Sequence, residues 1–158
     1  MLQDLFAGGS AWPLAAALKG SRYAYPIVNA IHIMAIGTLF GAILALDLRL
    51  LGVARSLPVK PLALYLPRVA GCGLAIAILT GLLLFLVQPL DYIGNRAFIV
   101  KISLVGLGVT HALAVHVSDG WRQLVRGSGE IGRGLRISAA LSLTLWVAAI
   151  LAGRFIAF

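Results

Sequence analysis

Charged residues are scarce in this sequence. They make up 11% of its 158 residues, whereas hydrophobic residues make up 61%. A soluble domain carries about 25% charged residues, because its surface has to be hydrated. This chain has too few polar side chains to cover a globule of its size, so we infer that most of its surface faces lipid. The composition excludes an ordinary soluble domain, and the length allows one transmembrane domain over residues 1–158.

Cysteine and acidic residues are also scarce. A single cysteine, Cys72, excludes an internal disulfide and a multi-cysteine metal site. Asp and Glu total five, and there is no HExxH pattern, nucleotide-binding glycine loop or visible Ser-His-Asp set. These absences disfavour hydrolysis and phosphoryl transfer. We expect the chain not to be an enzyme on its own.

Basic residues outnumber acidic ones and give a net charge of +8. They stand at the ends of apolar runs and do not cluster on one face, so we expect no nucleic-acid partner. They are better explained as determinants of membrane topology and as contacts to the anionic headgroups of the lipid bilayer.

Four apolar runs are long enough to cross a membrane, which takes roughly 20 residues in a helix. We predict spans at about residues 25–46, 69–87, 98–117 and 137–156. Prolines 58, 61 and 67 are expected to break any helix between the first two spans. The sequence therefore predicts an all-α, integral membrane four-helix bundle.

The loops indicate an orientation. The stretches 47–68 and 119–136 are rich in arginine, whereas the other connections carry few basic residues. By the positive-inside rule, we expect these two loops to be cytoplasmic and both termini to lie on the opposite side of the membrane. We expect that membrane to be a bacterial inner membrane, which would place both termini in the periplasm. Residues 1–20 have Asp4 where a signal peptide has a basic residue, so we predict an interfacial helix with Trp12 at headgroup level.

Polar residues inside the predicted spans are the candidates for chemistry, because polar groups are costly in hydrocarbon. Tyr25, Asn29 and His32 share one face of the first span, and Lys101 and His111 lie on roughly one face of the third. Neutral imidazole ligates haem iron, so His32 and His111 are the candidate metal ligands of one haem b. Tyr25, Asn29 and Lys101 would complete the cofactor site.

The two histidines are predicted to differ in depth by roughly 9 Å, although two axial ligands should lie at nearly equal depth. Helix tilt would remove part of that difference in depth, and a haem with a single histidine ligand needs no second ligand at the same depth. The alternative is that the histidines form hydrogen bonds between helices, as His116 near the cytoplasmic end is expected to do. Asp47 is either a helix-end charge at the headgroups or a functional carboxylate. Lys101 either snorkels, pairs with Asp91, or binds a headgroup or haem propionate.

Small residues predict close helix packing. Gly37 and Gly41 form a GxxxG pattern in the first span. A stripe of small residues runs along the second span and consists of Gly71, Gly73, Ala77 and Gly81. Both patterns permit close approach within the bundle or across a homodimer.

Two stretches carry a resemblance to a known family. The run from Tyr25 to His32, then Gly41 and Asp47-Leu48-Arg49-Leu50-Leu51-Gly52, resembles an uncharacterised bacterial family of small four-helix inner-membrane proteins with the pattern YPxxxxxH and DLRLLG. The later residues Thr80, Gly81, Phe85, Tyr92, Asn95, Phe98 and Lys101 also fit it. The resemblance covers nearly the whole chain and implies the topology, but it supplies no activity.

A more remote similarity is to the copper-resistance membrane protein D and to membrane cytochrome b bundles. With three histidines, the chain has too few for two haems, which leaves one haem or a copper ion bound by histidine and Met34. Two functions therefore stay open. One is a redox protein with one haem b that exchanges electrons with quinone or a periplasmic redox protein. The other is a non-enzymatic transport, metal-handling or complex-assembly subunit.

Overall fold

The computed structural model describes residues 17–18, 20–87, 89, 92, 94–127 and 130–157. Its regular elements in these ranges are helical: α3 (Ala24–Leu51), α4 (Val59–Val87), α6 (Arg96–Val117), α7 (Asp119–Arg126), α8 (Arg133–Arg154) and the 3₁₀ turn η2 (Phe155–Ala157). Four of these helices, α3, α4, α6 and α8, are long and apolar enough to cross a membrane. The predictions of an all-α chain and of four such helices are confirmed. The predicted interfacial helix of residues 1–20 lies almost entirely outside the described residues.

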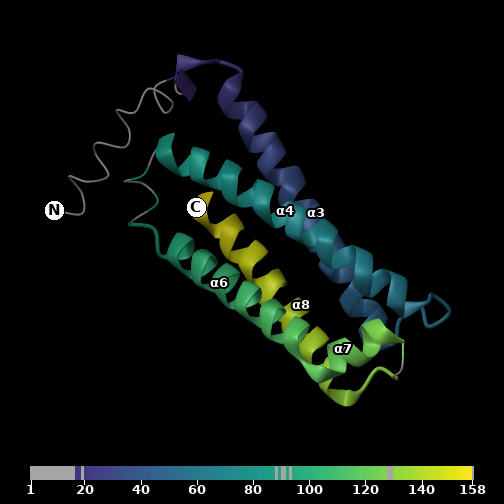
Figure 1. The fold of residues 1–158 in the computed structure, drawn as a ribbon. Helices are drawn as coiled ribbons and strands as arrows, with labels where there is room; N and C mark the ends of the chain where they lie inside the picture. Colours follow the sequence, from purple (N-terminus) through teal and green to yellow (C-terminus); the bar gives the residue numbers. More distant parts are fainter. Residues whose placement is uncertain are drawn as a thin grey trace.

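The long helices form two antiparallel pairs, as Figure 1 shows. α3 packs along α4, α6 packs along α8, and contacts between α3 and α8 join the pairs. The short helix α7 lies across the end where α3 finishes and α4 begins, and it contacts α4. Loop 52–58 and α7 therefore gather the two predicted arginine-rich loops at one end of the molecule. Lys60 Nζ donates a hydrogen bond from α4 to the Arg126 carbonyl at 3.4 Å.

Helix α4 differs from the prediction. It begins at Val59, ten residues before the expected start of the second span, and Pro67 lies inside it. The prediction that the prolines break any helix before Arg68 is therefore wrong. Pro61 is in the first turn, where a backbone N–H has no intrahelical partner to lose. Pro67 costs α4 one interior hydrogen bond, which the long flanking helix tolerates.

The other boundaries moved less, and each end has a local cause. α3 continues past residue 46 to Leu51 and stops at Gly52, whose φ of 103° is in the left-handed region that favours glycine. Asn95 caps α6: its side chain accepts from the backbone N–H groups of Ala97 (2.9 Å) and Phe98 (3.4 Å). The same side chain donates to the Ile156 carbonyl at 3.1 Å, which ties the start of α6 to η2, directly after α8.

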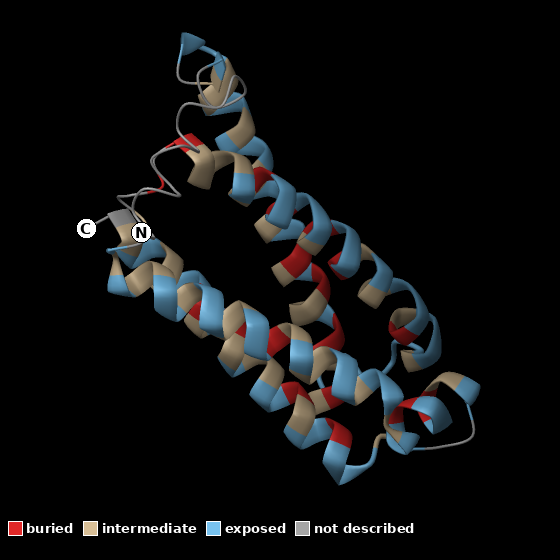
Figure 2. Ribbon diagram, turned by 60° about the vertical axis from the view of Figure 1, so that its left-hand side comes forward, coloured by how far each residue is buried: buried red, intermediate tan, exposed pale blue. Residues whose placement is uncertain are grey.

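Few residues are buried (Figure 2), and large apolar side chains are exposed on every long helix. Ile33, Leu79 and Leu113 are 62%, 64% and 64% exposed, for example. The buried residues form two small clusters along the seam between the pairs. One lies toward α7 around Trp121 and Leu124, and the next lies around Trp146. A helix that is apolar all round needs an apolar surrounding, which for these helices a bilayer would supply.

The glycine predictions separate into two outcomes. A Cβ at Gly73 would lie 2.8 Å from the Leu39 backbone nitrogen and 3.0 Å from the Ala35 carbonyl oxygen, so α4 approaches α3 closely there. The predicted small-residue stripe of the second span therefore packs against α3 at this residue. Gly37 and Gly41 have nothing within 4 Å of such a Cβ, so their GxxxG pattern does not serve packing within the described chain. A homodimer through that face stays a prediction.

Candidate functional site

A partly open cavity of about 290 Å³ lies between the helices near the α7 end, and several polar side chains line it. Residues of α4 and α6 line it from two sides, and residues of α3, α7 and α8 complete it. Most of the lining is aliphatic or aromatic, including Trp121 and Trp146. The polar side chains among its lining residues are Asp47, His111, His116, Ser138 and Ser142.

Asp47 is the most unusual of these residues. Its side chain lies on the buried stripe of α3 with Leu39, Leu46 and Leu50, and the residue is only 6% exposed. The Ser142 side chain of α8 lies near its carboxyl group, but Oδ2 has no hydrogen-bond partner among the described residues. The residue is therefore not a helix-end charge at the surface. One of its carboxyl oxygens therefore lies inside the bundle without a hydrogen-bond partner from the described part of the chain.

His111 reaches the same cavity from α6. Its Nε2 lies 3.0 Å from the Ser138 carbonyl oxygen and 3.2 Å from the Ser138 hydroxyl. A carbonyl only accepts, so we infer that Nε2 carries the proton and Nδ1 is the bare nitrogen. This bond joins α6 to α8, as the structural alternative for this histidine predicts.

His116 lies one turn and a half further along α6, at the rim. Its Nδ1 bonds the Ala112 carbonyl of its own helix at 2.7 Å, and its ring lies 4.4 Å, centroid to centroid, from that of Trp121. It therefore positions α7 against α6 and closes that end of the cavity.

His32 lies in a different place, against α4. Its Nδ1 is 2.8 Å from the Thr80 hydroxyl, and its ring covers Gly81, where a Cβ would lie 3.1 Å from Cε1. The Thr80 hydroxyl donates to the Ile76 carbonyl at 2.7 Å, so it accepts the Nδ1–H of His32 and leaves Nε2 bare. Along α3, His32 is about 22 Å from Asp47 at 1.5 Å per residue. The structure does not bring His32 and His111 to one centre.

The remaining predicted site residues lie toward the His32 end. Tyr25 is half-buried and Asn29 is exposed, and the side chain of neither residue forms a hydrogen bond with another described residue. The Lys101 stem packs on Gly153 of α8, at 3.4 Å from the Cβ position, and its ammonium likewise bonds no described residue. Asp91, its predicted partner, lies outside the described residues. Met34 is 64% exposed on the outside of the bundle, beside the seam of α3 and α4.

The described part of the chain holds no group of three or more His, Cys, Asp or Glu side chains that could share a metal ion. Neither a protein-family model, nor a curated protein, nor a solved structure matches the chain. Fold and site together define a class: in its described residues the chain is a helical bundle whose four long helices could each span a membrane, with a buried carboxylate beside a partly open cavity.

Sequence reasoning named His111 and weighed Asp47, but it missed that they line one cavity with Ser138 and Ser142. A signal was present. Ser138 and Ser142 are four residues apart and so share a face of α8, and Asp47 is flanked at helical spacing by Ile43 and Leu50. Which helix faces which could not be read from these spacings.

Proposed function

We propose that this chain is a multi-pass protein of a bacterial inner membrane, with both termini in the periplasm. Its four long apolar helices support the first part. The gathering of both arginine-rich loops at the α7 end supports the orientation, because basic loops stay on the cytoplasmic side. An interfacial helix over residues 1–20 belongs to the same proposal.

Within that membrane, the chain acts as a non-enzymatic transport subunit that binds a small monovalent cation in the Asp47 cavity. The observation that carries this proposal is the unpartnered, buried Oδ2 of Asp47. An ionisable group inside a membrane bundle is expensive, and such groups mark ion and substrate paths. A bound cation would supply the partner that this oxygen lacks among the described residues.

The chemistry of the cavity favours one positive charge. Asp47 is the only acidic residue among the lining residues, and a divalent metal would need further anionic or imidazole ligands that the described residues do not gather. The walls are apolar, with the indole rings of Trp121 and Trp146 among them, and such rings attract ammonium groups. Small amines and alkali ions share the required charge, and the experiment distinguishes them.

The test is thermal unfolding of the purified full chain in neutral detergent. Sodium, potassium or methylammonium chloride is titrated against N-methylglucamine chloride at constant ionic strength. At a concentration 100 times the Kd, a ligand stabilises the folded state by about 2.7 kcal/mol, or about 5–10 °C in a chain of this size. We expect that rise for at least one cation in the wild type and none in D47N.

The matched control is D119N, because Asp119 is an exposed carboxylate whose side chain is 89% accessible. D119N should respond like the wild type. The proposal fails if no cation raises the melting temperature, or if D47N responds as strongly as D119N. Uptake of the stabilising cation into proteoliposomes, absent in D47N, then tests transport as distinct from binding.

One observation favours a second candidate, a haem b held by His32. Metal-bound histidines usually donate their other ring nitrogen to an acceptor, and the Thr80 hydroxyl accepts from Nδ1 while Nε2 stays bare. His32 would be the axial ligand, Lys101 would pair with a propionate, and the haem would supply electron transfer with quinone or a periplasmic redox protein. The absorption spectrum of the purified protein decides: a Soret band lost in H32A supports this candidate, and a colourless preparation rejects it.

A further inference from the structure

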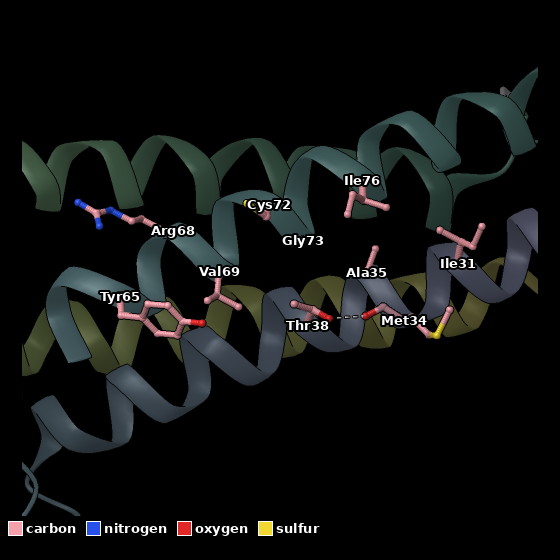
Figure 3. Close-up of a pocket in the computed structure, with 10 residues that line it drawn as sticks. All are labelled: Ile31, Met34, Ala35, Thr38, Tyr65, Arg68, Val69, Cys72, Gly73 and Ile76. Atoms are coloured by element: carbon pink, nitrogen blue, oxygen red, sulfur yellow. Dashed lines mark hydrogen bonds between the residues drawn. The ribbon is translucent and has the colours of Figure 1, made fainter. Parts of the chain in front are cut away.

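A second cavity lies on the outside of the bundle, along the seam of α3 and α4 (Figure 3). It is a groove of about 480 Å³ that shares no lining residue with the Asp47 cavity. Its floor is formed where Gly73 meets Ala35, and its walls are apolar over most of their length. Tyr65 and Arg68 lie at the end nearer α7, and Ile31 and Ile76 lie at the other.

Arg68 is the only charged residue of this groove. It is exposed, and it forms no hydrogen bond or ion pair with another described residue. Although α4 begins at Val59, Arg68 is about 14 Å along the helix, where the predicted apolar span of residues 69–87 begins. Its side chain extends back along α4 toward the end where Tyr65 lies (Figure 3). If that apolar stretch spans a bilayer, the guanidinium lies near the level of the lipid headgroups, where anionic phosphates can pair with it.

We propose that the groove binds one anionic phospholipid, whose phosphate pairs with Arg68 and whose acyl chain lies along the apolar floor. Arginine holds phosphate through several charge-assisted hydrogen bonds, and the Tyr65 ring is of a kind that favours the headgroup boundary. One molecule then satisfies both the charge and the apolar length of the groove.

A second copy of the chain is a poorer occupant. None of the groove residues is acidic, so a two-fold dimer through this face would place each Arg68 against an uncharged partner surface. The lipid brings its own negative charge. This inference depends on membrane insertion but not on Asp47, so it stands or falls separately from cation binding.

Cys72 gives a direct readout, because it is the only cysteine of the chain and it is an exposed lining residue of the groove. The rate of its alkylation by N-ethylmaleimide is measured on the full chain in neutral detergent, with phosphatidylglycerol or phosphatidylcholine added. Occupancy of nine-tenths of the sites should slow alkylation about tenfold. We expect that slowing with phosphatidylglycerol and little with phosphatidylcholine.

Three variants decide the role of the charge. R68Q should lose the protection while its alkylation rate in detergent alone stays that of the wild type, which shows that the groove is intact. R68K should keep most of the protection, and R126Q, which removes an exposed arginine of α7, should keep all of it. Equal protection by both lipids, or protection of R68Q, overturns the proposal. Protection that appears without lipid and grows with protein concentration also overturns it, in favour of a second copy.

Discussion

Replacement of Gly73 by alanine tests the packing of α4 on α3. The new methyl carbon would lie 2.8 Å from the Leu39 backbone nitrogen, 3.0 Å from the Ala35 carbonyl oxygen and 3.1 Å from the Leu39 Cα. Ordinary contact begins at 3.4 Å, so the two helices must separate by about 0.6 Å at this level. All three obstructing atoms are backbone, and no side-chain rotation relieves the contact.

The magnitude follows from two opposing effects. Alanine in place of glycine gains about 1 kcal/mol of helix propensity at an interior position. Overpacking of a tight contact costs typically 1–3 kcal/mol, and we expect the upper part of that range because rigid backbone resists. Gly71 isolates the first effect, since it is in the same helix and nothing lies within 4 Å of its Cβ position. G73A should therefore be about 2–3 kcal/mol less stable than G71A.

The assay is reversible unfolding of the chain in mixed micelles with increasing sodium dodecyl sulfate, followed by the fluorescence of the tryptophans, of which Trp121 and Trp146 are buried. Both variants are compared at the same mole fraction of dodecyl sulfate. If G73A proves as stable as G71A, α4 does not approach α3 as closely as described, and the floor of the groove between α3 and α4 is described wrongly.

Three further predictions use the same unfolding assay. N95A should lose about 0.5–2 kcal/mol, because α6 loses its cap and η2 loses a donor, and N95D should fall between it and the wild type because the carboxylate still caps. G52A should lose about 1–2 kcal/mol from the left-handed backbone at the end of α3, whereas G134A, at an open position with ordinary φ, should not. T80V should lose about 1–3 kcal/mol by leaving a ring nitrogen of His32 unpaired, and T80S should retain most of that stability; equal stability of T80V and T80S would reject the hydrogen bond.

The apolar runs predicted the long helices well, because a helix that crosses a membrane is apolar over about 20 residues and such a run is easily recognised in a sequence. The run lengths predicted the ends poorly, since hydropathy measures the apolar stretch and not the extent of hydrogen bonding. α4 shows this most clearly. Lys60, Pro61 and Pro67 all read as loop in the sequence, yet they continue one helix beyond its apolar part.

The site was predictable in its residue types but not in its grouping. His32 and His111 were easy to single out, because histidine is rare in long apolar runs. Their partners, Thr80 and Ser138, are separated from them by 48 and 27 residues, and they meet only because α3 packs on α4 and α6 packs on α8. Nothing in the spacing of these residues along the chain indicates that the two histidines serve different helix pairs.

The DLRLLG string shows how local requirements and a functional one can be separated. Gly52 ends α3, the Arg49 side chain donates to the Leu57 carbonyl at 2.7 Å and holds the loop, and Leu50 is buried. None of these roles involves Asp47. An interaction with the nearby Ser142 side chain would survive in the amide of asparagine, whereas a buried carboxylate carries a desolvation cost that an uncharged side chain avoids. Without added cation, D47N should accordingly be at least as stable as the wild type. That result would mean that the fold gains nothing from a negative charge at this position, and the cation that we propose would then account for the charge.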